Sequence, residues 1–322
     1  MRLLMGEFCV KTAKESNAFM LFLMIYSFAV SIPIGALRPH VEPPVLVALV
    51  TVLTFGVPSV AVVLKAGARW REIMPLRWIG WKNLLFVIAL VVFVQPLMMS
   101  LSALMAAVFG NEVANTVGGL ASSTGLGVTF LLVVVLPSLF EEIAFRGVIF
   151  SGYMRGKLLP AVLINGLFFG MMHLNLQQFP YTFCMGALFA CLVYYTRSVL
   201  TGIVAHFAVN GVQLLLLAIG AAGDAPPVGA AAAQAAGQAA AAAAQRPEGK
   251  PELIAALILF VIAQFVMPLF IWVFWRFVKH NKKRNQNAAP EPAEDMQGRT
   301  FDWAFWSVIA LYVYFCVMAY LL

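Results

Sequence analysis

Nine long apolar runs divide this 322-residue chain, and they constrain its fold more than any other feature. Each run has roughly the 17–25 residues with which a helix crosses a bilayer. Lipid offers the backbone no hydrogen bonds, so only helices and closed barrels span a membrane. We therefore predict an all-α polytopic integral membrane protein, with eight or nine transmembrane helices in a conical or bundle-like core that encloses a polar intramembrane cavity. The runs cover residues 18–37, 45–64, 84–109, 128–152, 158–174, 180–195, 199–219, 253–278 and 303–322.

The composition and the loop charges agree with a membrane protein. Hydrophobic residues make up 62% of the chain and charged residues only 11%, with a mean hydropathy of +0.90, whereas an average soluble domain is about 25% charged. The net charge of +7 arises mainly from Lys and Arg in the loops at 65–82, 152–158, 196–198 and 279–302. Cytoplasmic loops carry such an excess, which predicts a cytoplasmic N-terminus, an external C-terminus, the lipid bilayer as a partner, and no nucleic acid.

These runs and loops divide the chain into four parts. Residues 1–124 form the N-terminal spans and residues 125–220 a core of four spans. Residues 221–252 are a low-complexity loop rich in alanine, which we interpret as a long connection without fixed structure. Residues 253–322 form two C-terminal spans, joined by a basic cytoplasmic linker at 279–302. A bacterial inner membrane is the expected location, because no eukaryotic retention signal is visible.

A small set of ionisable residues lies inside the apolar runs. Glu141, Glu142 and Arg146 fall in the fourth run, His173 in the fifth and His206 in the seventh. A charged side chain at the bilayer centre costs about 2.5–3.5 kcal/mol even on the more lenient scale. We therefore expect these residues to face one another or a water-filled cavity, and to carry the function.

The spacing assigns these residues to helix faces. Glu142 and Arg146 are four residues apart, which favours an ion pair along one helix and predicts a structural role. Glu141 is turned about 100° away and is free to face another group. His206 and Asn210 share a face in the same way, while Phe169 precedes His173 by one turn and is expected to pack beside its ring; Asn165 is a further polar companion. Counting about 1.5 Å per residue places Glu141, His173 and His206 near mid-membrane.

Three kinds of chemistry fit this set. Glu141 could act as a general base on a water that attacks a peptide carbonyl, with His206 and Asn210 stabilising the oxyanion. Glu141, His173 and His206 could instead bind Zn²⁺, although the chain has neither an HExxH helix nor a cysteine zinc signature. Buried Glu and His residues also build ion paths in transporters. Asn210 is a poor zinc ligand and a good oxyanion donor, which favours a reaction without metal.

The ordered motifs Glu141-Glu142-x-x-x-Arg146, Phe169-x-x-x-His173 and His206-x-x-x-Asn210 resemble the CPBP family, the CAAX proteases and bacteriocin-processing enzymes also called Abi. The resemblance covers about residues 125–212 and implies an intramembrane endopeptidase. It implies that Glu141 is the catalytic base, that His173 helps to hold the water, and that His206 with Asn210 forms the oxyanion pair. Glu142, Arg146 and Phe169 would support them, and Zn²⁺ dependence stays open because both metal-dependent and metal-free members have been described.

Two other functions remain open at this stage. A non-catalytic scaffold or immunity protein of the same family would keep the helices without needing the chemistry. An ion or solute transporter would use the buried Glu and His residues, although no inverted repeat is apparent. For an endopeptidase in a bacterial membrane, the expected substrate is a peptide, a bacteriocin precursor or a segment of a membrane protein.

Overall fold

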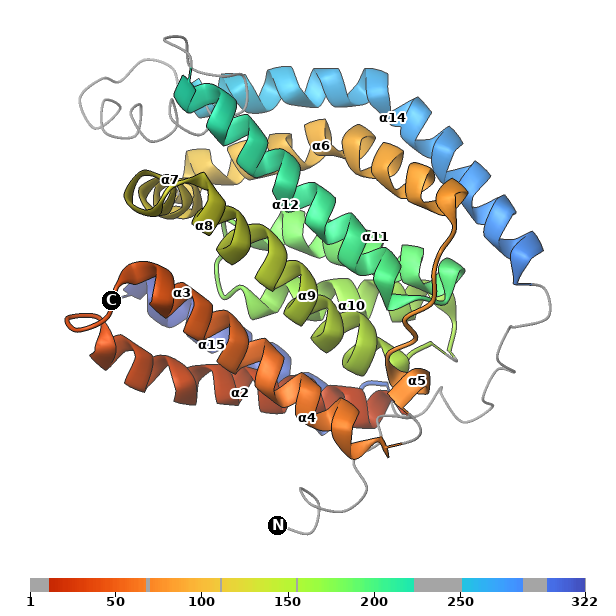
Figure 1. Ribbon diagram of the computed structural model, residues 1–322, viewed down its shortest axis with the longest axis horizontal. Coiled ribbons are helices and arrows are strands. Elements are labelled where there is room, and N and C mark those ends of the chain that lie inside the picture. Colours follow the sequence, from red (N-terminus) through yellow and green to blue (C-terminus); the bar gives the residue numbers. More distant parts are fainter. Residues whose placement is uncertain are drawn as a thin grey trace.

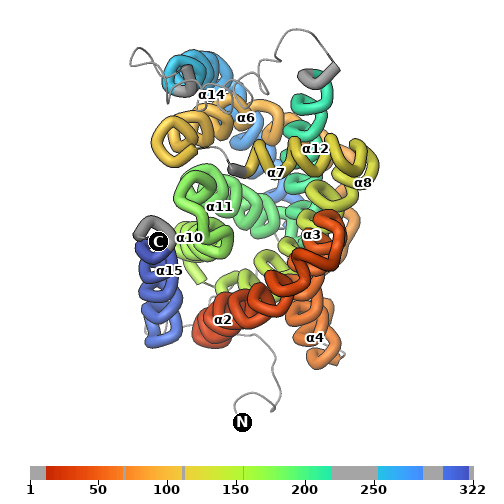
Figure 2. Tube along the Cα trace, turned by 90° about the vertical axis from the view of Figure 1, so that its left-hand side faces the viewer, coloured from red at the N-terminus to blue at the C-terminus, as the bar shows by residue number. Residues whose placement is uncertain are grey.

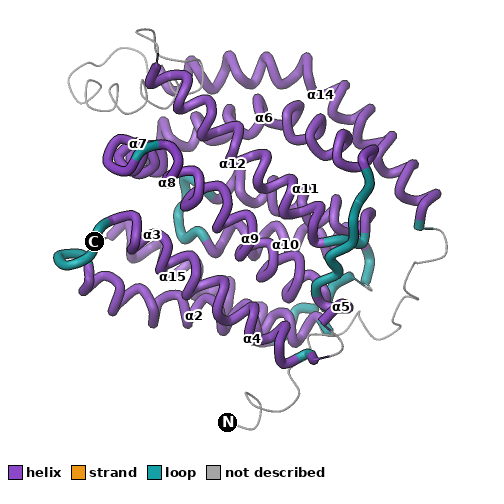
Figure 3. The backbone as a smooth tube through the Cα atoms, viewed as in Figure 1, coloured by secondary structure: helices purple, strands orange, loops and turns teal. Residues whose placement is uncertain are grey.

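The computed structural model describes residues 12–67, 70–110, 112–154, 156–222, 251–285 and 300–321, and all regular secondary structure in these ranges is helical (Figures 1 and 3). The elements are α2 (Ala13–Leu37), α3 (Pro43–Thr51), η1 (Val52–Gly56), α4 (Val57–Lys65), α5 (Trp70–Ile73), α6 (Trp81–Phe109), α7 (Glu112–Thr124), α8 (Leu126–Phe130), η3 (Leu131–Val135), α9 (Leu136–Glu142), η4 (Ile143–Ile149), α10 (Leu158–Met172), α11 (Phe179–Thr196), α12 (Val199–Ala222), α14 (Pro251–Arg284) and α15 (Trp303–Leu321).

The predicted all-helical membrane fold is confirmed. By length and apolar character, seven helical stretches in the described residues can cross a bilayer, and two shorter apolar helices accompany them, at Leu158–Met172 and Trp303–Met318. Together they correspond to the nine apolar runs. Side chains along the outer face of α14 are exposed and almost all apolar, as expected for a surface in contact with lipid; they include Leu257, Phe265, Leu269 and Trp272.

Two boundaries differ from the sequence prediction. The connection predicted at 110–127 is largely helical, because it contains α7 (Glu112–Thr124). The helix α14 continues to Arg284, past the predicted end at Val278, and its last turn carries Lys282, Lys283 and Arg284. Positive charges favour the C-terminal end of a helix, and Arg284 also donates hydrogen bonds to the carbonyl oxygens of Trp78 and Ile79.

Most of the predicted loop at 221–252 and the linker residues 286–299 lie outside the described ranges.

The helices form three groups around the centre of the protein. α6 packs along α14 on one side, α2 packs against α15 on the other, and α10 packs along α11 between them (Figures 1 and 2). Two hydrophobic clusters follow this division: one joins α2, η4 and α10, and the other joins α6, α11 and α12. Phe145 and Phe169 belong to the first cluster, and Phe189 and Val209 to the second. The ionisable residues lie where these two clusters meet.

Glycines allow α10 and α11 to approach closely. A Cβ atom on Gly166 would lie 2.8 Å from the Phe183 carbonyl oxygen, and one on Gly186 would lie 2.9 Å from Phe169 Cβ. Gly170 is similarly close to Phe179. Small residues at helix contacts are how membrane helices pack without a hydrophobic driving force between them. The close contact fixes the position of α10, which carries Phe169 and ends at His173.

Candidate active site

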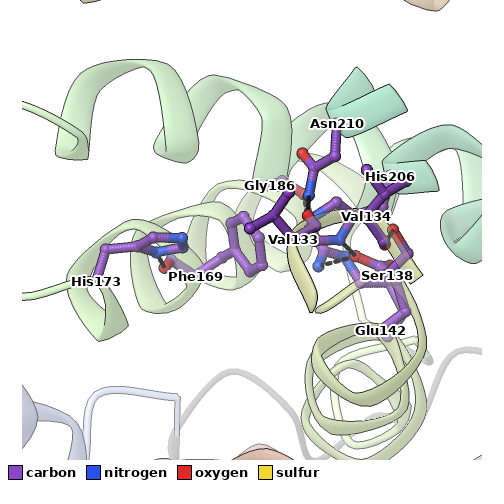
Figure 4. Close-up of polar contacts among 10 residues, drawn as sticks. Val133, Val134, Ser138, Glu142, Phe169, His173, Gly186, His206 and Asn210 are labelled. Carbon is purple, nitrogen blue, oxygen red and sulfur yellow. Dashed lines mark hydrogen bonds and ion pairs between the residues drawn. The ribbon is translucent and has the colours of Figure 1, made fainter. Parts of the chain in front are cut away.

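Three helical regions contribute the predicted site residues, of which Figure 4 labels Glu142, Phe169, His173, His206 and Asn210. The continuous helix α9–η4 carries Glu141, Glu142 and Arg146, the end of α10 carries His173, and α12 carries His206. The segment η4 is a π-helix, which is a rare conformation that often marks functional positions. The helices α9, η4 and α11 all pack against α12, so Glu142 and His206, which are distant in sequence, come into contact.

The Glu142 carboxylate lies at the centre of a buried ion-pair network. Its Oε1 atom accepts hydrogen bonds from Arg146 Nη1 at 2.7 Å and from His206 Nδ1 at 3.0 Å. The side chains of Glu142 and Arg146 are fully buried, and that of His206 is 7% exposed. The predicted pair of Glu142 with Arg146 is present. The bond from His206 was not predicted, because His206 had been paired in our interpretation with Glu141 and Asn210 rather than with Glu142.

Arg146 is stabilised on several sides. Its Nη2 atom donates to the Gly186 carbonyl oxygen at 3.0 Å, and its guanidinium carbon lies 4.4 Å from the ring centroid of Phe169 and 5.2 Å from that of Phe189. Cation–π contacts of this kind gain strength when they are shielded from water. The guanidinium therefore links η4, α10 and α11, in keeping with the predicted structural role of Arg146.

Glu141 lies on the other face of the same helix and lines a cavity of about 400 Å³. His173, His206 and Asn210 line this cavity together with Glu141. Glu142 and Arg146 are not among its lining residues in the described part of the chain. The structure thus brings the four predicted catalytic residues to one cavity. Of the three predicted supporting residues, Phe169 also lines the cavity, whereas Glu142 and Arg146 do not.

The ring of His173 is held by its own helix. Its Nδ1 atom donates a hydrogen bond to the Phe169 carbonyl oxygen at 2.9 Å, since a carbonyl can only accept. The Phe169 ring packs edge-on against the imidazole at 5.1 Å between centroids, as predicted from their spacing. The next residue, Leu174, has a φ of 50° and ends the helix there. The Nε2 atom of a neutral His173 is consequently left as the acceptor that a water could use.

Asn210 joins α12 to the helix that carries Glu141. Its Nδ2 atom donates to the Val133 carbonyl oxygen at 2.9 Å, within the π-helical segment η3. This bond uses one of the two hydrogens of the amide, and the other remains for a second acceptor. One turn before Asn210 on the same helix, His206 also lines the cavity, so the predicted common face of the two residues is present.

The candidate metal ligands Glu141, His173 and His206 lie around one cavity. In the described residues, no three side chains of His, Cys, Asp or Glu are grouped so that they could hold a metal ion. The set Glu141, His173 and His206 shares the cavity, but the His206 Nδ1 atom is committed to Glu142.

Sequence reasoning missed a group of polar residues in the cavity wall. Gln177, Gln178, Tyr181 and Thr182 line the cavity near His173, and the Tyr181 hydroxyl donates to Gln178 Oε1 at 3.2 Å. Gln177 and Gln178 fall between the fifth and sixth apolar runs, and Tyr181 and Thr182 open the sixth, so none of them is an ionisable residue deep inside a run. The signal that could have identified these residues is a run of amide and hydroxyl side chains at the start of an apolar span.

The central segment matches a known protein family. Residues 123–212 match the family model described as Type II CAAX prenyl endopeptidase Rce1-like. The CPBP resemblance is confirmed. The match begins just before α8, ends within α12 and contains all the site residues predicted from the sequence, whereas α2–α6, α14 and α15 lie outside it. No curated protein and no solved structure matches the chain.

Proposed function

We propose that this protein is an intramembrane endopeptidase of the CAAX-protease type, which hydrolyses a peptide bond with a water activated by Glu141. One observation carries the proposal: Glu141, His173, His206 and Asn210 line a single cavity, while the neighbouring Glu142 and Arg146 stay behind its wall. The family match supports the reaction class, because its description names an endopeptidase. The proposed setting is a bacterial inner membrane with the N-terminus in the cytoplasm, as the loop charges predict.

In the first step, the Glu141 carboxylate removes a proton from a water, and the water oxygen attacks the carbonyl carbon of the scissile bond. The free Nε2 atom of His173 accepts the second hydrogen bond of this water and orients it toward the substrate. The proton then passes from Glu141 to the leaving amine as the carbon–nitrogen bond breaks. Glu141 therefore acts first as a base and then as an acid.

The oxyanion that forms in this step needs hydrogen-bond donors on the cavity wall. Asn210 supplies the second hydrogen of its amide. His206 supplies Nε2–H when its ring carries both protons, since Nδ1–H is bound to Glu142. With His206 charged, the formal charges of Glu141, Glu142, Arg146 and His206 sum to zero. Fixed donors of this kind contribute about 2.7–4 kcal/mol each to related reactions.

The cavity suits an extended peptide entering from the membrane. The polar residues Gln177, Gln178 and Tyr181 lie at one part of the wall, where they can bind the backbone of the substrate. Apolar residues of α6, α7 and α12 line other parts of the wall, including Met98, Val117 and Leu217. The proposed substrate is therefore a peptide or a membrane-protein segment whose scissile bond lies next to apolar residues.

The proposal is tested with purified protein in proteoliposomes and a library of fluorogenic apolar peptides. We expect cleavage by the wild-type protein and its loss in Glu141→Gln and His173→Ala, each compared at equal amounts of folded protein. Cleavage that is unchanged in both variants contradicts the proposal. A lack of cleavage together with Glu141-dependent proton flux across the same liposomes would indicate a transporter instead.

A further inference from the structure

The second oxygen of the central carboxylate has an unusual environment. Glu142 Oε1 accepts from both Arg146 and His206, whereas Oε2 is buried and has no hydrogen-bond partner among the described residues. Gly202 on α12, which has no side chain, lies beside this oxygen. A Cβ atom on Gly202 would lie 2.3 Å from Glu142 Oε2 and 3.3 Å from Glu142 Cδ.

The space beside Gly202 decides where the Glu142 carboxylate can lie. A contact of 2.3 Å is far inside van der Waals distance, so a side chain at residue 202 and the present carboxylate position exclude each other. The carboxylate cannot simply swing away, since Oε1 is held by two donors and the surroundings are buried. Gly202 also lies one helical turn before His206, so the same turn of α12 provides both the space and the donor.

We propose that Gly202 is a positioning residue, whose missing side chain gives the Glu142 carboxylate the place from which it orients His206 toward the cavity. The part of the inference that concerns activity rests on the proposed endopeptidase function. Gly202 touches neither the cavity nor the reacting atoms, and it acts through Glu142 alone. Glycine inside a helix is less favourable than alanine by about 1 kcal/mol. The space that Gly202 leaves for the Glu142 carboxylate explains why a glycine stands at this position.

A double-mutant cycle between residues 202 and 142 tests the inference. In Gly202→Ala the carboxylate must move, and we expect kcat to fall about tenfold or more while KM stays within about twofold. In Glu142→Asp the side chain is one methylene shorter and withdraws from α12. Adding Gly202→Ala to that variant is then expected to change kcat by less than about twofold.

The matched control is Gly211→Ala on the same helix. A Cβ atom there would meet only Val134 Cγ1 at 3.9 Å, which is an ordinary contact, and Gly211 does not line the cavity. This variant is expected to keep the wild-type kcat. An equal fall in kcat from Gly202→Ala in the wild-type and Glu142→Asp backgrounds would overturn the proposal, since it would point to the other close contact at Val193.

A measurement without substrate separates this inference from the proposed function. Protein labelled with ¹⁵N-histidine gives ring-nitrogen signals from four imidazoles, and His206→Gln identifies those from His206. Gly202→Ala should shift the His206 signal and Gly211→Ala should not, whether or not any peptide is cleaved. An unshifted His206 signal in folded Gly202→Ala overturns the inference. If Gly202→Ala does not fold, recovery of folded protein by adding Glu142→Asp supports it, and failure in both backgrounds contradicts it.

Discussion

Two faces of one helix give adjacent glutamates different surroundings. On the cavity face, Glu141 meets a space of about 400 Å³ that it shares with two histidines and an asparagine. On the buried face, Glu142 is fully enclosed and bound to Arg146 and His206. The two residues have the same chemistry and are one position apart, so only the helix geometry and the packing of α10–α12 distinguish them. The environment, and not the residue type, separates the carboxylate that we propose to react from the one that is held in the ion-pair network.

Two residues connect the cavity face of the helix to the buried face. His206 belongs to both, because its Nδ1 atom binds Glu142 behind the wall and its ring lines the cavity. Phe169 has a similar position, with ring contacts to Arg146, His173 and His206. Substitutions on the buried face should therefore change stability first and activity second, and those on the cavity face should do the reverse.

The largest effect is expected on the cavity face. Glu141→Gln keeps the size of the side chain and removes the base, so kcat should fall by about 10⁴-fold. The melting temperature in detergent should stay close to that of the wild type, because Glu141 makes no ion pair in the described residues. A variant that loses stability along with activity would break the distinction between the two faces.

Substitutions on the buried face should lower the stability of the protein more than its activity. Glu142→Gln leaves Arg146 buried without a counter-charge, and breaking a buried pair costs about 3–5 kcal/mol. Chemical denaturation in mixed micelles measures this loss of unfolding free energy. The double variant Glu142→Gln with Arg146→Met removes both charges and should recover part of the stability. A stability equal to that of the wild type in Glu142→Gln alone would contradict the structural role.

His173→Ala should affect the cavity face less than Glu141→Gln, because the carboxylate still accepts the proton. We expect kcat to fall by about 10²-fold from loss of the group that orients the water. His173→Gln, which retains a hydrogen-bond acceptor, is expected to keep more activity than His173→Ala. Equal rates in the two variants would argue that the His173 Nε2 atom does not contact the water.

Phe169→Leu tests the residue shared by both faces. It removes the ring that lies 4.4 Å from the Arg146 guanidinium and 5.1 Å from the His173 ring. We expect a loss of about 1–2 kcal/mol in unfolding free energy, with a moderate fall in kcat. Phe168→Leu, one residue earlier and directed into the contact with Phe305, is the matched control and should lower stability without a selective loss of kcat.

The smallest effect is expected from ionic strength. The ion pairs of Glu142 are fully buried, so raising the salt concentration from 0.1 to 0.5 M should leave the cost of Glu142→Gln within about 0.5 kcal/mol. An exposed pair would lose most of its contribution under the same change. A strong salt dependence would mean that water reaches the buried face.

Much of this arrangement could be predicted from the sequence. Apolar length identifies the spans, and the i, i+4 spacing identifies the pair of Glu142 with Arg146 and the common face of His206 with Asn210. The partner of His206 could not be predicted, because the contact of α12 with α9 depends on tertiary packing. The role of Gly202 was hidden for the same reason, since a glycine in a helix gives no sign of what it faces. The helix α7 was missed because its Gly118–Gly119 and Ser122–Ser123 pairs are typical of a loop.

The origin of the oxygen in the product tests the central claim most directly. Cleavage of a peptide substrate is carried out in H₂¹⁸O, and mass spectrometry determines the label in the new carboxyl terminus. Wild-type protein is predicted to give one ¹⁸O atom per cleavage, and Glu141→Gln at the same folded concentration to give no labelled product over the same time. Labelled product formed by Glu141→Gln at the wild-type rate would contradict the assignment of Glu141 as the base that activates the water.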